Sequence, residues 1–233
     1  AEEKAAEEVK PSHVEMVLVL DESGSMSDLT RDTIGGFNSM IEKEKKLDVD
    51  AHVTTVLFND QYKMLYNRRE LKDVSKMTDK DYTPGGMTAL LDAVGRTIHK
   101  MDMVAGIHRK DKGNKVLFVI ITDGEENDSK EYTYADVKKL IKDRQENAGW
   151  EFIFLGANID AAAAAENLGI DRDRAVKYKN TGSGVRANFK AVAELSDSLA
   201  KSGRVSDRWK ETVEKDEDDA ADKQSAAVTS HRR

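Results

Sequence analysis

The sequence predicts a doubly wound α/β domain, in which helices cover both faces of a mostly parallel sheet. Two strongly apolar runs, at residues 13–20 and 116–122, have the composition of strands that are buried on both faces. Segments with helical periodicity separate the predicted strands, and parallel neighbours require such long crossovers. The chain of 233 residues can bury a sizeable core, and we expect residues 12–203 to form one domain.

The first half of the chain alternates strands with helices. After the strand at 13–20, apolar residues recur at helical spacing and predict a helix at about 29–45. Residues 51–60 indicate a second strand, and residues 62–66 are suited to pair with it antiparallel at an edge of the sheet. A long amphipathic helix is predicted to begin within or just after "PGGMT", at residues 84–88, with its methionines in the core.

The second half continues this alternation up to a charged end. The expected elements are a helix around 137–141, a strand at 150–158, a short alanine-rich helix ending near Gly169, a last strand at 175–180 and an amphipathic helix at 185–203. Residues 204–233 hold much charge and few large apolar side chains, which predicts a flexible tail or a solvated helix. Residues 1–11 form a charged N-terminal extension.

Composition excludes several classes of function. The formal net charge of −7 disfavours an electrostatic grip on nucleic acid or anionic lipid, so neither is an expected partner. No apolar run reaches the roughly 18 residues of a membrane span. The chain contains no cysteine, and its first ten residues carry acids where a signal peptide is basic and then apolar. We therefore expect a cytoplasmic protein.

Acidic and hydroxyl side chains follow the two most apolar strands. Asp21 ends the first strand and is followed by Ser23 and Ser25, while Asp123 follows the strand at 116–122. Ligands of open parallel sheets bind beyond the carboxyl ends of the strands, so both acids are expected to face one crevice. Two neighbouring carboxylates repel unless one is protonated or a cation lies between them. Oxygen donors of this kind are the ligands that Mg²⁺ prefers.

These residues resemble the metal-ion-dependent adhesion site of the von Willebrand factor A (VWA) domain family, which combines Asp-x-Ser-x-Ser with a distant threonine and a distant aspartate. "DESGSM" is similar to the first loop of that site and supplies Asp21, Ser23 and Ser25. "PGGMTALLDAV" is similar to the second loop and supplies Thr88, and "ITDGEEN" resembles the third and supplies Asp123. The three loops occur in the family's order, and each leads into a predicted helix.

The resemblance implies a Rossmann-like interaction module rather than an enzyme. In the family, the hydroxyls bind Mg²⁺, Mn²⁺ or Ca²⁺ directly and the aspartates act mostly through water. Ser23, Ser25 and Thr88 are thus the implied direct ligands, with Asp21 and Asp123 in the water-mediated role. A partner's Asp or Glu would complete the shell. The first loop and the lack of cysteine resemble intracellular prokaryotic or phage members, whose partners include AAA+ ATPases and stress-response complexes.

Each site residue also has a simpler explanation when it is taken alone. Asp21 and Ser23 are suited to cap the next helix, Thr88 to cap the helix from Ala89, and Asp123 to form a turn with Gly124. Their joint occurrence in order favours the metal site. The acids that follow Asp123 are expected at its rim, where they would tighten the metal or repel acidic partners; they are Glu125, Glu126 and Asp128.

Other chemistries fit the sequence less well. A haloacid dehalogenase-like phosphatase requires a second acid where Ser23 stands, and no nucleotide-binding loop follows the first strand. The histidines show no ligand spacing such as H-x-x-x-H, which disfavours a zinc site; they are His13, His52, His99, His108 and His231. Two alternatives to the adhesion module stay open: a scaffold domain acting through a metal-independent surface and, less favoured, a metal-dependent phosphatase-like hydrolase.

Overall fold

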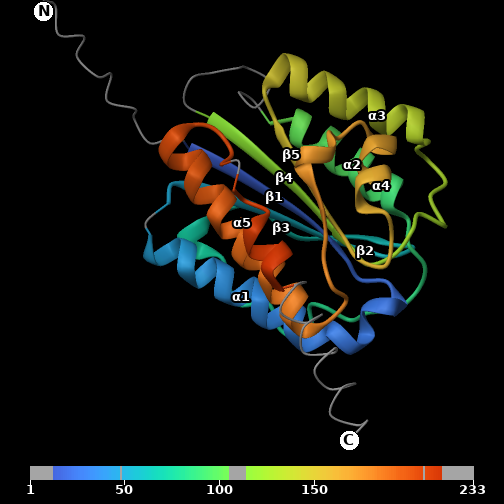
Figure 1. Cartoon of the computed structure of the whole chain (residues 1–233), viewed down its shortest axis with the longest axis horizontal. Helices are drawn as coiled ribbons and strands as arrows, with labels where there is room; N and C mark the ends of the chain where they lie inside the picture. The colour runs from blue at the N-terminus through green and yellow to red at the C-terminus, as the bar shows by residue number, and fades with distance from the viewer. Residues whose placement is uncertain (1–12, 48, 105–113, 207, 217–233) are drawn as a thin grey trace, which may run out of the picture.

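The computed structural model describes residues 13–47, 49–104, 114–206 and 208–216. They form a six-stranded sheet in the order β3-β2-β1-β4-β5-β6, with helices on both faces (Figure 1). Neighbouring strands run parallel except for β2 and β3, which pair antiparallel at one edge. The structure confirms the predicted doubly wound α/β fold and the antiparallel edge.

The regular elements follow the predicted alternation along the chain. The strands are β1 (His13–Asp21), β2 (Ala51–Phe58), β3 (Tyr62–Glu70), β4 (Asn114–Thr122), β5 (Glu151–Gly156) and β6 (Ala175–Lys177). The α-helices are α1 (Thr30–Lys46), α2 (Leu90–Asp102), α3 (Tyr134–Asp143), α4 (Ala161–Leu168) and α5 (Gly182–Ser202). A 3-10 turn at Gly24–Leu29 joins β1 to α1.

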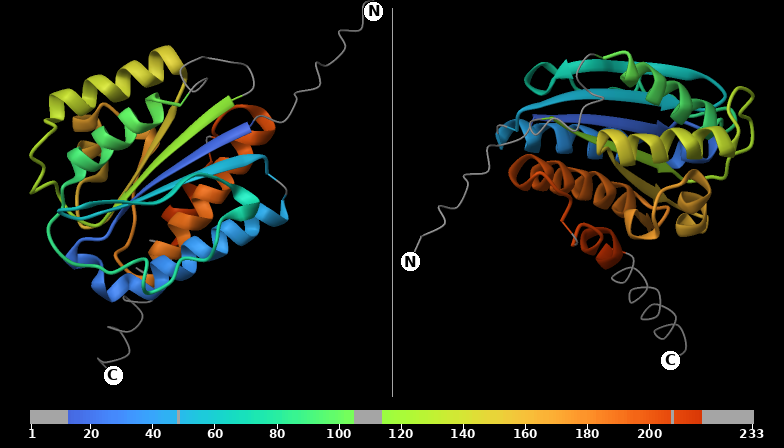
Figure 2. Two further views of the ribbon diagram at one scale, coloured as in Figure 1. Left: turned by 180° about the vertical axis from the view of Figure 1, so that it is seen from behind. Right: turned by 90° about the horizontal axis from the view of Figure 1, so that it is seen from above.

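The central strand β1 is apolar on both faces because both faces are covered. Met16, Leu18 and Leu20 belong to the core between the sheet and helices α1 and α5. Val17 and Val19 point the other way, into the core beneath α2, α3 and α4. The left view of Figure 2 shows these two helix layers on opposite sides of the sheet. A strand buried on both faces carries no polar alternation, which explains the continuous apolar run.

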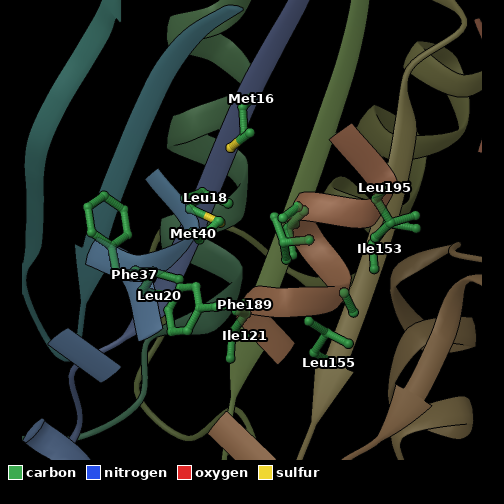
Figure 3. Packing of buried hydrophobic residues seen from close by; sticks show 14 of the residues in the cluster. Met16, Leu18, Leu20, Phe37, Met40, Ile121, Ile153, Leu155, Phe189 and Leu195 are labelled. Carbon is green, nitrogen blue, oxygen red and sulfur yellow. The ribbon is translucent and has the colours of Figure 1, made fainter. Parts of the chain in front are cut away.

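Helices α1 and α5 approach each other closely over the sheet. Phe37 and Phe189 meet edge to face, with ring centroids 6.2 Å apart, beside Leu20 (Figure 3). Gly36 makes this approach possible, because a Cβ at this position would lie 2.5 Å from Cδ2 of Phe189. The contact between the two helices therefore depends on the absence of a side chain at one residue.

One predicted core residue lies outside the core. Helix α2 begins at Leu90, so Met87 belongs to the loop that precedes it, and 50% of its surface is exposed. The apolar face of the helix itself is buried as predicted, with Met101 only 1% exposed. The prediction that the methionines here are all core residues is wrong for Met87, because the helix starts after it.

Part of the charged C-terminal segment packs onto the domain. Val205, Trp209 and Val213 are 6%, 2% and 1% exposed and join the core beneath α1 and α5. The indole N–H of Trp209 donates to the carbonyl of Asp173 at 3.3 Å. The predicted N-terminal extension and the rest of the tail, 217–233, lie outside the described residues. Within the described ranges, no helix combines the length and hydrophobicity needed to cross a membrane.

Candidate metal centre

Two buried acids stand at the carboxyl ends of β1 and β4, which we call the Asp21 end of the sheet. The parallel register pairs Leu20 with Ile121, so the residues that follow them meet. Thr122 donates its hydroxyl to Oδ2 of Asp21 at 2.6 Å. Asp21 and Asp123 are only 1% and 2% exposed. Strand pairing thus places the two carboxylates in one crevice, as the order of the strands requires.

A chain of hydrogen bonds links the first loop to the second acid. Oδ1 of Asp21 accepts the backbone N–H of Ser23 at 2.7 Å. The hydroxyl oxygens of Ser23 and Ser25 lie 3.1 Å apart, and Ser25 donates to Oδ1 of Asp123 at 2.6 Å. Four of the five predicted residues are therefore joined in one hydrogen-bonded network. Ser25 is exposed, so the network reaches the surface.

Backbone contacts tie the second loop to the first. The N–H of Gly24 donates to the carbonyl of Gly86 at 3.2 Å, and the N–H of Gly85 donates to the carbonyl of Glu22 at 2.9 Å. The buried carboxylate of Glu22 accepts both the N–H and the hydroxyl of Thr83. These bonds hold the loop that carries the predicted threonine beside the Asp-x-Ser-x-Ser loop.

Thr88 lies between the second and third loops. Its N–H donates to Oδ1 of Asn127 at 2.8 Å, and its carbonyl accepts the N–H of the same residue at 3.0 Å. The Thr88 hydroxyl also lies close to Gly124, the residue that follows Asp123: a Cβ built on Gly124 would be 3.7 Å from this hydroxyl. Thr88 is 4% exposed. The structure thus brings all five predicted residues to the Asp21 end.

Helix capping does not account for these side chains. The residue that precedes α2 is Ala89 rather than Thr88, and it makes no side-chain cap bond. Ser23 precedes the turn at Gly24–Leu29, and its hydroxyl makes no cap bond there. The hydroxyls of the first loop are directed instead toward each other and toward Asp123. The simpler explanation for Ser23 and Thr88 is therefore removed.

The electrostatics of the crevice favour a cation. Burial raises the pKa of Asp21, and the negative charge of Asp123 raises it further, against hydrogen bonds from Ser23 and Thr122 that lower it. A divalent ion between the two carboxylates would remove this repulsion. The donor atoms are two carboxylates and three hydroxyls, all oxygen, which suits a hard ion such as Mg²⁺. The residues present therefore fit the ion that the resemblance implies.

Two asparagines that sequence reasoning missed complete the surroundings of the second acid. Asn180 donates its amide to Oδ2 of Asp123 at 3.3 Å, and Asn158 donates to the carbonyl of the same residue at 3.5 Å. Each lies two or three residues beyond the end of a strand, β5 or β6. The rule that ligands bind beyond the carboxyl ends of parallel strands, applied to every strand, would have found both.

Two of the three acids at the predicted rim, Glu126 and Asp128, have structural partners. Glu126 accepts the N–H of Leu91 at 2.9 Å and the hydroxyl of Ser129 at 2.7 Å, so its carboxylate caps the first turn of α2. Asp128 pairs with Lys130 at 3.4 Å. Glu126 thus fixes the third loop to α2, a role that the spacing of the acids did not indicate.

The fold and the loops at its Asp21 end define this chain as a VWA domain. Residues 13–175 match the vWA-TerF-like family, described as "vWA found in TerF C terminus". The match spans well over half of the sequence, and the chain belongs to this family. The comparison with curated proteins found no match.

Solved structures share the fold at low sequence identity. A von Willebrand factor type A protein from Catenulispora acidiphila is 15% identical (TM-score 0.53), and the match covers 79% of this chain and 43% of that one. The ArnB paralog VWA2 from Sulfolobus acidocaldarius is 17% identical (TM-score 0.52), covering 80% and 46%. The vWF domain of the pili tip protein Mfa5 from Porphyromonas gingivalis is 12% identical (TM-score 0.57), covering 84% and 99%. This chain thus spans less than half the length of the Catenulispora and Sulfolobus proteins.

Proposed function

We propose that this VWA domain is a divalent-metal-dependent interaction module that binds an acidic side chain of a protein partner at the Asp21 end. In this proposal Ser23, Ser25 and Thr88 bind Mg²⁺ directly, and Asp21 and Asp123 act mostly through water. The observation that supports it most is the hydrogen-bonded network that runs from Asp21 through the two serines to Asp123.

The charge balance of the donor set explains why such an ion would take an acidic ligand. Neutral hydroxyls quench little of the charge of a divalent ion, so it stays electrophilic toward the open side. The two carboxylates are buried, whereas Ser25 is exposed. A partner carboxylate that approaches from solvent would therefore complete the coordination on the exposed side of the network.

The neighbours of the site favour binding over catalysis. Asp21 and Asp123 are held by the hydroxyl of Thr122 and the amide of Asn180, and Thr88 is held by Asn127. Hydroxyl and amide groups do not ionise near neutral pH, so they are poor general acids and bases. We therefore propose a binding module rather than an enzyme, with the scaffold domain and the hydrolase as the alternatives that the experiments below separate.

A recess beside the third loop would accept an adjacent part of the partner. It has a volume of about 250 Å³ and is lined in part by Gly124, Glu125, Tyr134 and Ile159. Tyr134 is 44% exposed and offers an amphipathic contact. We propose a partner that presents Asp or Glu next to an apolar side chain. AAA+ ATPases and stress-response complexes of a prokaryotic cytoplasm are the candidate classes, in line with the lack of cysteine.

Calorimetric titration of Mg²⁺ and Mn²⁺ into metal-stripped protein tests the metal site. We expect one ion per Asp21 end and a loss of affinity of tenfold or more in Asp21→Ala and Thr88→Ala. Ser27→Ala is the matched control, because this exposed serine lies in the same loop outside the donor set. Circular dichroism shows that each variant is folded. Equal affinity in wild type and both site variants would contradict the proposal.

Partner capture separates the alternatives. For the proposed module, a partner retained by the wild type is released by chelator and is not retained by Asp21→Ala. A scaffold that acts through another surface retains its partner in both cases. A hydrolase would cleave p-nitrophenyl phosphate in the presence of Mg²⁺, and Asp21→Ala would abolish that cleavage.

A further inference from the structure

A second cluster of metal-ligating side chains lies at the opposite end of the sheet. His13 and Glu15 are two residues apart in β1, so their side chains lie on the same face of the strand. His52 is the second residue of β2. The parallel register pairs Glu15 with His52, so all three side chains meet although the histidines are far apart in the sequence. In the part of the chain that the structure describes, this is the only group of three or more His, Cys, Asp or Glu residues that meets in this way.

The three donor atoms form a triangle of the size that one metal ion requires. Nδ1 of His52 lies 2.9 Å from Nε2 of His13, and each nitrogen lies 3.3 Å from Oε1 of Glu15. Ligands at the usual Zn–N and Zn–O lengths of about 2.1 Å lie about 3.4 Å apart in a tetrahedral site. An ion can therefore reach all three atoms with only small movements of the side chains.

A carboxylate outside the triangle orients the first imidazole. Asp50 lies immediately before β2, and its Oδ1 is 3.0 Å from Nδ1 of His13. When Nδ1 donates this hydrogen bond, Nε2 is the ring nitrogen that remains to bind an ion at the triangle, once it is deprotonated. Such carboxylate–histidine pairs are the usual support of histidine ligands in metal sites.

Burial leaves one side of the triangle open. The side chain of Glu15 is 3% exposed, whereas those of His13 and His52 are 17% and 28% exposed. The carboxylate thus lies at the base of the cluster and the imidazoles lie at its mouth. A fourth position is accessible to water or to a ligand from another molecule.

Arg68 of β3 also contacts the carboxylate. Its Nε lies 3.2 Å from Oε1 and 3.0 Å from Oε2 of Glu15, and a second guanidinium nitrogen binds Oε1. The guanidinium and the carboxylate form an ion pair, so Arg68 holds the Glu15 side chain in place. Arg68 Nη2 also lies 3.5 Å from Nδ1 of His52. A carboxylate has about four lone-pair sites, so Oε2 can keep the Nε of Arg68 if Nη2 moves off Oε1 to admit an ion.

We propose that His13, Glu15 and His52 form a second metal site that binds Zn²⁺ or a similar ion such as Co²⁺ or Ni²⁺. Imidazole nitrogen favours these ions, while the oxygen-only Asp21 end favours Mg²⁺, so the two ends of the sheet differ in metal preference. The sequence spacing of the histidines indicates no zinc site, because the ligands come from two neighbouring strands rather than from one helix.

Zinc titration of the metal-stripped full chain in saturating Mg²⁺ tests this site. We expect one strong Zn²⁺ ion and a loss of affinity of at least tenfold in His13→Ala and His52→Ala. His99→Ala is the matched control, since this histidine is exposed on α2. Binding by His52→Ala with wild-type affinity, or no strong Zn²⁺ binding by the wild type, would overturn the proposal.

Two further measurements identify the ligands and the independence of the site. Co²⁺ in place of Zn²⁺ should give the intense visible absorption of a four-coordinate site in the wild type and lose it in His52→Ala. Asp21→Ala should retain Zn²⁺ with unchanged affinity, because its site lies at the other end of β1. Loss of Zn²⁺ binding in a folded Asp21→Ala protein would assign the zinc to the Asp21 end and overturn the proposal.

Discussion

Glu44 is a fully buried carboxyl group in the interface between α1 and α5. Its Oε2 accepts the hydroxyl of Ser196 at 2.8 Å, and its Oε1 has no hydrogen-bond partner among the residues that the structure describes. Burial raises the pKa of Glu44 to about 7, and the charge of Asp197 adds to the shift, against the bond from Ser196. The carboxyl group therefore changes its protonation state in the neutral range.

This group makes the stability of the domain depend on pH. The folded-state pKa lies above the unfolded value near 4.5, so the unfolded chain releases the proton first. The contribution of Glu44 to the free energy of unfolding should fall as pH rises from about 4.5 to about 7, by on the order of 3 kcal/mol, and level off above that range. Glu44→Gln, which stays neutral, should lack this loss and become the more stable protein above pH 7.

Urea unfolding of wild type and Glu44→Gln across this pH range measures the effect. Glu42→Gln, on the more exposed side of the same helix, is the control and should keep the wild-type slope. The prediction would be contradicted if wild type and Glu44→Gln differed in free energy of unfolding by the same amount at pH 4.5 and at pH 7.

At the proposed Mg²⁺ site, Asn180 positions the second acid. Its amide donates to Oδ2 of Asp123 while Ser25 occupies Oδ1. Removing a group that orients a metal ligand costs about 10- to 100-fold in affinity, so Asn180→Ala should weaken Mg²⁺ binding at the low end of that range. Calorimetry beside Asn147→Ala, which removes an exposed amide, checks this. Unchanged Mg²⁺ affinity would show that Asn180 does not act on Asp123.

Two adjacent glycines of α1 differ in what surrounds them. A Cβ at Gly36 would lie 2.5 Å from the ring of Phe189, whereas a Cβ at Gly35 would meet nothing within 4 Å in the described part of the chain. Alanine is the better helix former by about 1 kcal/mol, so Gly35→Ala should stabilise the domain by roughly that amount. Gly36→Ala should destabilise it by about 1–3 kcal/mol, because the ring must move.

Thermal unfolding of the two variants measures this contrast. Both carry the same chemical change in the same helix, so a difference in sign isolates the contact between α1 and α5. Stabilisation by both substitutions would show that α1 and α5 can move apart at Phe189 without loss of stability.

At the scale of the whole molecule, the segment after α5 belongs to the domain. Trp209 is 2% exposed in the core shared with α1 and α5, and its indole reaches the carbonyl of Asp173 before β6. Trp209→Ala should cost about 3–5 kcal/mol of stability, as other buried tryptophans do. Arg208→Ala, at a side chain that is 84% exposed, should change it by less than about 0.5 kcal/mol. Equal unfolding midpoints for these two variants would show that the segment is not part of the folded unit.

The fold could be predicted well because its signals are local. The apolar runs of β1 and β4 have a length and composition that only a doubly covered strand explains, and the periodicity between them indicates helices. The end of a parallel strand is also a local signal, so Asp21, Ser23 and Asp123 could be assigned to one end of the sheet. Thr88 was assigned by its resemblance to a known loop rather than by any pattern of its own.

The sequence by itself determined the order of strands and helices and the oxygen-rich character of the loops after β1 and β4. Only the tertiary structure decided which residues from distant parts of the chain come into contact. Examples are the hydrogen bond from Asn180 to Asp123, the pairing of Glu15 with His52, and the burial of Trp209. Hydrophobic periodicity depends on residues within a few positions of each other. Strand register and helix packing join residues far apart in the chain, and no local pattern encodes those distances.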